Sequence, residues 1–169
     1  MTSFNLHALK LRSGEQYQDE QEVQLSPLEL GGQRYLPVPE KIPAELRVSR
    51  ASTGTVFELD FTGRLHGPCQ RCLADAVVER RIRTREYQAA SPDAADDLQS
   101  PYVHADRLDL SQWARDALAL ELPVQILCRP ECAGLCPVCG KDLNVEPHEH
   151  EEEQLDPRWT ELEKLRGQL

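Results

Sequence analysis

Three cysteine pairs constrain the fold of this 169-residue chain more than any other feature of its sequence. The first pair stands in the stretch CQRC, and the other two share the stretch CRPECAGLCPVCG more than 50 residues later. In chain order the pairs are Cys69 and Cys72, Cys128 and Cys132, and Cys136 and Cys139. A structural zinc ion takes four ligands in a tetrahedron. Six thiols exceed what one ion needs, so one pair is expected to be spare.

The stretch CPVCG has the features of a zinc knuckle, a tight turn that points two thiolates at one ion. Pro137 presets the backbone of the turn, and Gly140 permits the positive φ that closes it. CQRC has the same spacing without either feature, so it is the weaker knuckle. Two knuckles from distant segments form a zinc-ribbon pattern. The first-choice ligands are therefore Cys69, Cys72, Cys136 and Cys139.

Two other sets of four thiols remain open. The second choice joins CQRC to Cys128 and Cys132, whose spacing also suits a metal. The third places all four thiols of the later stretch on one ion and leaves CQRC free. His66 is a fifth candidate ligand. His148 and His150 stand in EPHEHEEEQ, which we expect to be a solvated acidic tail.

A redox role for CQRC is a weaker hypothesis. Reactive CxxC motifs of the thioredoxin type open a helix after a strand, where the first thiol has a lowered pKa. Here CQRC falls between two expected strands. The sequence also has no phosphate-binding glycine loop, HExxH or GxSxG motif, so we expect a protein that is not an enzyme.

The charge is acidic overall and segregated along the chain. The formal net charge of −10 argues against a protein that coats nucleic acid, which requires clustered Lys and Arg. Residues 64–85 nevertheless carry a local charge of +4, whereas residues 145–169 carry −5. Arg81, Arg83 and Arg85 would share one face of a strand. They are candidates to contact RNA or a partner, but pairing with the protein's own acids is the favoured interpretation.

Hydrophobic periodicity predicts an α+β fold. Residues 44–50, 55–65 and 76–87 read as three strands of an antiparallel meander or barrel-like sheet, with Phe57, Leu59, Phe61 and Leu65 on the buried face. Residues 4–12 read as a short strand, and the polar segment that follows reads as loop with short extended pieces. One main helix is expected from an N-cap at Asp109 to about Leu122, and a short C-terminal helix after Asp156. Cysteine loops stabilised by zinc complete the predicted fold.

The N-terminus has no apolar run behind a basic start, and no stretch of 18 apolar residues occurs in the sequence. We therefore expect a cytoplasmic protein without a membrane partner. In a reducing compartment, paired cysteines are metal ligands more often than structural disulfides.

The combination of GPCQRCL with LPVQILCRPECAGLCPVCGKDLN resembles the YceD family, the large ribosomal RNA subunit accumulation proteins of bacteria and plastids. The resemblance implies a role in the synthesis, processing or stability of 23S rRNA, with no catalytic residues to carry over. It implies ribosomal large-subunit components as partners, namely rRNA or a basic ribosomal protein. We expect residues 1–144 to form one YceD-like domain with cysteines at 69–72 and 128–139, and 145–169 to form an acidic tail.

Overall fold

The computed structural model of the protein describes residues 2–150. The chain divides into two compact units, Met1–Cys132 and Ala133–Leu169, which we call the first and second units. The predicted domain boundary after residue 144 stays a prediction. The expected helix after Asp156 lies outside the described residues.

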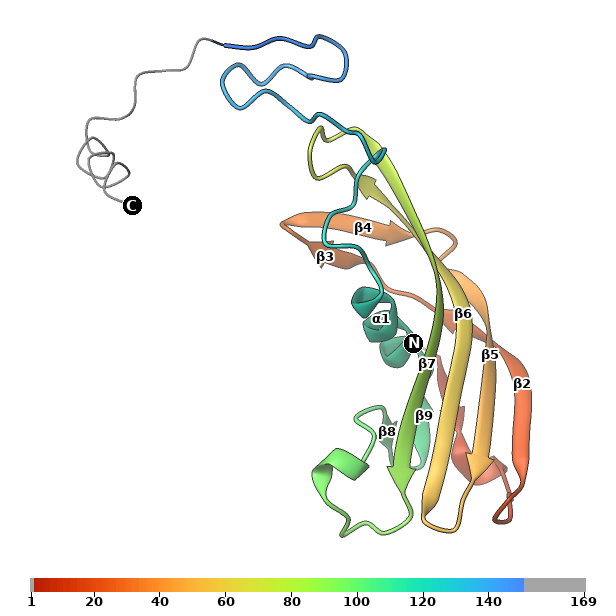
Figure 1. The fold of residues 1–169 in the computed structure, drawn as a ribbon. Coiled ribbons are helices and arrows are strands. Elements are labelled where there is room, and N and C mark those ends of the chain that lie inside the picture. The colour runs from red at the N-terminus through yellow and green to blue at the C-terminus, as the bar shows by residue number, and fades with distance from the viewer. Residues whose placement is uncertain (1, 151–169) are drawn as a thin grey trace, which may run out of the picture. The chain divides into compact units, whose positions relative to one another are not determined.

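The predicted meander is confirmed in the first unit. Strands β5 (Lys41–Arg50), β6 (Gly54–Pro68) and β7 (Asp75–Ala89) follow one another in the chain and pair antiparallel in that order. Strand β2 (Gln16–Gln24) pairs antiparallel with the other edge of β5. The four strands lie side by side in the order β2, β5, β6, β7 (Figure 1).

The end of β6 that leads into CQRC has different neighbouring strands from the middle of β6. Strand β4 (Gln33–Pro37) pairs with β6 where Pro37 is opposite Leu65. Strand β3 (Leu28–Leu30) forms a hairpin with β4 through two glycines at positive φ, which suits a two-residue hairpin turn. This hairpin extends the sheet beyond the end of β5.

The barrel-like part of the predicted fold is wrong, because no pairing joins β2 to β7 among the described strands. Closure into a barrel is not required to bury the apolar face of the sheet. Its apolar face is covered by other elements, so curling the sheet onto itself would bury little more. The opposite face carries charged side chains that remain in water.

Helix α1 (Leu110–Leu120) covers the apolar face of the sheet (Figure 1). Its N-cap is Asp109, as predicted, and the Asp109 carboxylate accepts a hydrogen bond from the backbone N–H of Gln112 at 3.0 Å. Gly63 of β6 lies where an added methyl group would come within 2.9 Å of Leu118. The helix therefore packs closely against the middle of the sheet. Its buried residues are Leu110, Ser111, Trp113, Ala114, Ala117 and Leu118.

The core lies between α1 and the sheet. The predicted face of β6 is confirmed, since its members are all buried: Phe57, Leu59, Phe61 and Leu65. Their neighbours on β5 and β7 include Leu46, Val48 and Ile82, which are also buried. The sheet and helix thus share one layer of aliphatic and aromatic side chains.

The N-terminal part of the chain departs from the sequence prediction. Strand β1 is only Ser3–Asn5, and a 3₁₀ turn at Leu6–Ala8 follows it. Strand β1 belongs to a small three-stranded sheet with β9 (Arg107–Asp109) and β8 (Val103–His104). The segment predicted as loop with short extended pieces contains the short strands β3 and β4, but also the nine-residue strand β2, which was not predicted. Its sequence QYQDEQEVQ gives almost no apolar alternation, so its extended form depends on backbone pairing with β5.

Candidate metal centre

The stretch CQRC forms the turn between β6 and β7, as predicted. The turn is closed by a hydrogen bond from Cys69 N to Ala74 O at 2.7 Å and by one from Leu73 N to Cys69 O at 3.0 Å. Leu73 adopts a φ of 63°, the left-handed conformation that Gly usually takes after the second cysteine of a knuckle. The turn therefore has knuckle geometry in spite of the missing glycine. It does not open a helix, so the thioredoxin-like interpretation loses its structural basis.

The two residues between the cysteines hold a distant segment against this turn. Gln70 N donates to Ile126 O at 2.9 Å, and the Gln70 side-chain oxygen accepts from Ile126 N at 3.2 Å. The Arg71 guanidinium donates to Cys132 O at 3.1 Å. Ile126 is buried, which anchors the segment further. No local sequence pattern predicts these roles of Gln70 and Arg71.

These contacts bring four thiols together in the first unit. The Sγ atoms of Cys69 and Cys132 are 3.8 Å apart, and those of Cys72 and Cys128 are 3.6 Å apart. All four sulfur atoms lie within 4.8 Å of one another. A zinc–sulfur bond of about 2.3 Å sets the edge of a regular tetrahedron at about 3.8 Å. A disulfide would need about 2.05 Å, so the spacing fits a four-thiolate metal site.

The backbone favours the charged form of one thiol in this group. Burial alone would raise the pKa of Cys69, but backbone N–H groups of Cys72, Arg71 and Cys128 lower that pKa to about 6. Arg71 N lies 3.4 Å from Cys69 Sγ. At Cys72 the backbone N–H of Ala74 likewise acts to lower the pKa of the thiol. Burial and the neighbouring thiols outweigh it and raise the pKa of Cys72 to about 12. A further thiolate beside Cys69 would require a cation to balance the added negative charge.

The geometry of the first unit favours the second of the three sets of thiols, and the choice of ligands stays a prediction. Within the first unit CQRC lies with Cys128 and Cys132, which was the second choice. The reason is the set of hydrogen bonds from Gln70 and Arg71, which cysteine spacing does not encode. His66 is outside this group, and its imidazole lies 3.7 Å from the Asp75 carboxylate.

The third cysteine pair lies in the second unit, together with two histidines. Cys136, Cys139, His148 and His150 place their ligand atoms within 4.8 Å of one another. Backbone N–H groups of Cys139 and Val138 lower the pKa of Cys136 to about 6. The sequence prediction for His148 and His150 favours a solvated acidic tail, whereas the structure places both rings beside the third cysteine pair.

Replacing Arg71 with Ala should weaken metal binding by about 10-fold, because a residue that orients ligands typically contributes 10–100-fold to metal affinity. The substitution removes the donor to Cys132 O and the contact with Gln125 but leaves all four thiols in place. Competition with a chromogenic chelator would measure the affinity. Arg80→Ala is the matched control, since the Arg80 guanidinium contacts only the backbone of its neighbour Glu79 among the described contacts. Equal affinities of the two variants would contradict the orienting role.

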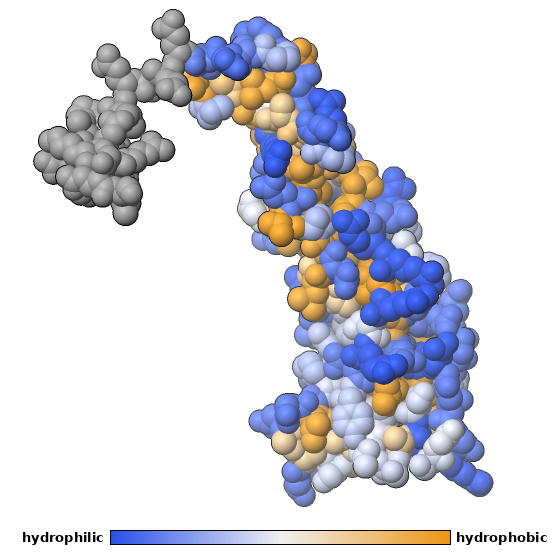
Figure 2. Space-filling view, in the orientation of Figure 1, coloured by the Kyte–Doolittle hydropathy of each residue, from blue (hydrophilic) through white to orange (hydrophobic). Residues whose placement is uncertain are grey.

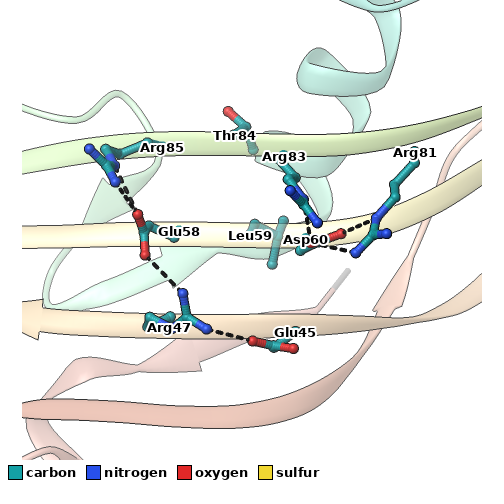
Figure 3. A pocket seen from close by; sticks show the side chains of 9 residues that line it. All are labelled: Glu45, Arg47, Glu58, Leu59, Asp60, Arg81, Arg83, Thr84 and Arg85. Atoms are coloured by element: carbon teal, nitrogen blue, oxygen red, sulfur yellow. Dashed lines mark hydrogen bonds and ion pairs between the residues drawn. The ribbon is translucent and has the colours of Figure 1, made fainter.

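Arg81, Arg83 and Arg85 project from one face of β7, as predicted, and meet acids of the neighbouring strand (Figure 3). The Arg81 guanidinium forms two hydrogen bonds with the Asp60 carboxylate, at 3.1 and 3.0 Å. Arg83 contacts Asp60 at 2.8 Å, and Arg85 pairs with Glu58. Figure 2 shows hydrophilic residues gathered over the middle of this sheet.

Strand β5 extends this network. The Arg47 guanidinium lies 3.4 Å from Glu58 and 2.9 Å from Glu45. The network therefore combines four guanidinium groups with three carboxylates on one face of the sheet. Most of the positive charge of the Arg stripe, which comprises Arg81, Arg83 and Arg85, is balanced within the protein. Contact of Arg81, Arg83 and Arg85 with RNA or a partner stays a prediction.

Acid should weaken this network. Hydrogen bonds from Arg81 lower the pKa of Asp60, and hydrogen bonds from Arg85 lower the pKa of Glu58. Because the folded pKa values lie below the unfolded value of about 4, the stabilisation is complete above that pH and is lost as pH falls through the folded values. Asp60→Asn should therefore cost stability at neutral pH, by less than about 1 kcal/mol at this exposed site.

The same variant should cost nothing at a pH where Asp60 is protonated in both states. Urea unfolding at neutral and acid pH would measure this difference. Asp93→Asn, in an exposed loop, is the control. A cost of Asp60→Asn that does not change with pH would contradict the electrostatic origin.

The fold and the thiols define a class, namely a small α+β protein with an open antiparallel sheet and a four-cysteine cluster suited to a metal ion. The chain belongs to the YceD family. The family model described as "Large ribosomal RNA subunit accumulation protein YceD" matches residues 57–166, which include all six cysteines.

Several known proteins have sequences similar to this chain. An uncharacterized protein of Mycobacterium tuberculosis is 38% identical over 128 residues, which are 73% of this chain and 61% of that protein. YlbN of Bacillus subtilis is 30% identical over 168 residues, covering 97% of this chain and 94% of YlbN. A chloroplastic protein of Zea mays, named large ribosomal RNA subunit accumulation protein YCED homolog 1, is 43% identical over 38 residues, 22% of this chain and 13% of that protein.

The chain thus spans less than two thirds of the length of the mycobacterial relatives. No solved structure matches the fold. Within residues 2–150, no helix has the length and hydrophobicity needed to cross a membrane.

Proposed function

We propose that this protein is a non-enzymatic factor in large ribosomal subunit biogenesis that supports the synthesis, processing or stability of 23S rRNA in the cytoplasm. Membership of the YceD family carries this proposal, since the family and its chloroplastic members are named for large-subunit rRNA accumulation. The described residues add a cluster suited to a structural metal rather than a catalytic one. Four thiols fill all positions of a tetrahedron, which leaves no open position for a substrate or water.

We propose zinc as the ion of the first unit, with Cys69, Cys72, Cys128 and Cys132 as its ligands. Thiolate tetrads select zinc or iron–sulfur chemistry, and a single centre with edges of 3.6 and 3.8 Å fits one zinc ion. The ion would tie the β6–β7 turn to the segment after α1.

A basic ribosomal protein is the partner that the charge distribution supports best. The formal net charge is −10, and the outer face of the sheet balances its own arginines. An acidic protein attracts a basic one over a long range and shields it from unproductive contacts with RNA.

The test is complementation of a bacterium that lacks its own family member. The wild-type chain should restore the ratio of 23S to 16S rRNA, whereas a Cys72→Ser, Cys128→Ser double variant should not. Arg80→Ala serves as the control and should restore the ratio fully. Failure of the wild-type chain to change the ratio in a strain that shows the defect would refute the proposal.

Affinity capture of the full chain distinguishes the partners. A basic ribosomal protein should remain bound after nuclease treatment. Recovery of rRNA alone, with every protein lost on nuclease treatment, would exclude the protein partner.

Direct binding of rRNA is the second candidate function, because the side chains of Arg81, Arg83 and Arg85 are 65–71% exposed in spite of their ion pairs. Binding through phosphates would weaken steeply between low and physiological salt. Replacing Arg81, Arg83 and Arg85 with Ser should then abolish binding. The matched control replaces three scattered, exposed arginines, Arg12, Arg34 and Arg80, with Ser. Equal binding by both triple variants would exclude the stripe.

A further inference from the structure

The short segment 133–150 has a defined backbone conformation but few packing interactions that stabilise it. It begins the second unit, and Cys136 is its only buried apolar side chain. An isolated bridge between Leu135 and Asp142 is its sole strand-like pairing. A segment of this size cannot offset its conformational entropy with so little burial and normally requires a cross-link or a metal ion.

The backbone around Cys136 has the geometry of a zinc knuckle. Cys136 N donates to Lys141 O at 2.8 Å, and Gly140 N donates to Cys136 O at 2.9 Å. Gly140 has a φ of 72°, so the conformation predicted from CPVCG is confirmed. This turn places Cys136 and Cys139 side by side, two residues apart.

His148 places a third possible ligand atom beside this turn. Its Nε2 atom lies 3.1 Å from Cys139 Sγ, and its Nδ1 atom lies 2.8 Å from the backbone oxygen of Glu146. A carbonyl oxygen only accepts, so Nδ1 carries the proton and donates. In its neutral form the imidazole then presents the Nε2 lone pair toward the thiols. A backbone carbonyl that orients an imidazole in this way is the usual support of a metal-bound histidine.

His150 supplies the fourth donor. Its ring lies edge-on to that of His148, with the ring centroids 4.9 Å apart. The four donor atoms lie within 4.8 Å of one another. Zinc–sulfur and zinc–nitrogen bonds of about 2.3 and 2.0 Å set a tetrahedral sulfur–nitrogen edge at about 3.5 Å. The observed 3.1 Å is a few tenths of an ångström shorter, which a small rotation of an exposed imidazole corrects.

We propose that Cys136, Cys139, His148 and His150 bind a second zinc ion, separate from the four-thiolate site of the first unit. Two sulfur and two imidazole donors in a tetrahedron select zinc among the divalent ions. All six cysteines then have a role, and no pair is spare. The second ion replaces the missing apolar core of residues 133–150.

Native mass spectrometry of the full chain loaded with zinc would measure the number of bound zinc ions. The wild-type protein should carry two ions. Cys136→Ser and a His148→Ala, His150→Ala double variant should each carry one, and the control His104→Ala, in exposed β8, should carry two. Wild-type protein with one ion at saturating zinc would overturn the proposal. So would a histidine double variant that keeps the second ion with unchanged affinity.

Cobalt substitution identifies the ligands without relying on loss of binding. His148→Cys should keep two metal ions and add one thiolate, so the thiolate-to-cobalt charge-transfer absorbance should increase by one sixth relative to the wild type. Unchanged absorbance with full occupancy would show that residue 148 is not a ligand. This result is independent of the rRNA proposal, because a chain with one metal ion could still restore 23S rRNA, and a chain with two could fail to do so.

Discussion

Removing the metal from the four-thiolate site should lower the stability of the first unit more than any change to its surface. A ligand that binds only the folded state contributes about 4 kcal/mol at a free concentration of 1,000 times its Kd. Structural zinc sites bind tightly enough to reach that regime. The unit should remain folded after chelation, since the sheet and α1 have their own core. Chemical unfolding with zinc and with a chelator would measure the loss.

Single cysteine variants show which thiols cause this loss. Cys72→Ser should reproduce the effect of chelation on the first unit, because it removes a ligand that lies 3.6 Å from Cys128. Cys136→Ser should leave the unit's stability unchanged. Hydrogen exchange should speed up in the β6–β7 turn and in residues 125–132 for Cys72→Ser only. Equal losses from Cys72→Ser and Cys136→Ser, with Cys128→Ser harmless, would restore the first-choice tetrad.

Trp113→Ala should destabilise the first unit by about 3–5 kcal/mol, the usual cost of truncating a large buried aromatic side chain. Trp113 is 1% exposed near the start of α1 and stacks on Tyr102 with ring centroids 6.2 Å apart. The cavity would lie between the helix and the sheet, where packing cannot collapse without moving α1. Urea unfolding of the metal-loaded protein would measure the loss.

Gln112→Ala is the control for this prediction. Gln112 is the exposed neighbour of Trp113 in the first turn of α1, and the substitution keeps the backbone N–H that Asp109 caps. Its cost should stay within about 0.5 kcal/mol. A cost of Trp113→Ala below about 1 kcal/mol would show that α1 is not held by this side chain.

The meander and the helix could be predicted because their residues follow strong local rules. Strand β6 alternates buried and exposed residues from Phe57 to Leu65, and α1 combines a capping Asp109 with an apolar stripe. Strand β2 follows no such rule, since its side chains are mostly polar on both faces. Its pairing partner β5 determines its conformation, and a partner distant in sequence gives no local signal. The open sheet was likewise unpredictable, because closure depends on what covers the apolar face.

The candidate site was predictable in its chemistry but not in its grouping. Cysteine spacing alone indicated metal binding, and CPVCG predicted the knuckle turn at Gly140. Spacing could not rank the pairs, because the ranking depends on Gln70 and Arg71, which lie inside CQRC and contact residues 126 and 132. A ligand role for His148 was disfavoured because a run of glutamates surrounds it. The Glu146 carbonyl that orients its imidazole becomes visible only in three dimensions.

The amino-acid sequence by itself determined the family, the three-stranded meander, the capped helix and the presence of thiol pairs at a spacing suited to a metal ion, since each follows from residues close together in the chain. The tertiary structure alone decided which thiols meet, that the arginines of β7 pair with Asp60 and Glu58, and that two histidines join the last cysteine pair. The physical reason is the same in each case. Ligand sets and ion pairs depend on distances of a few ångströms between segments that only the packed chain brings together.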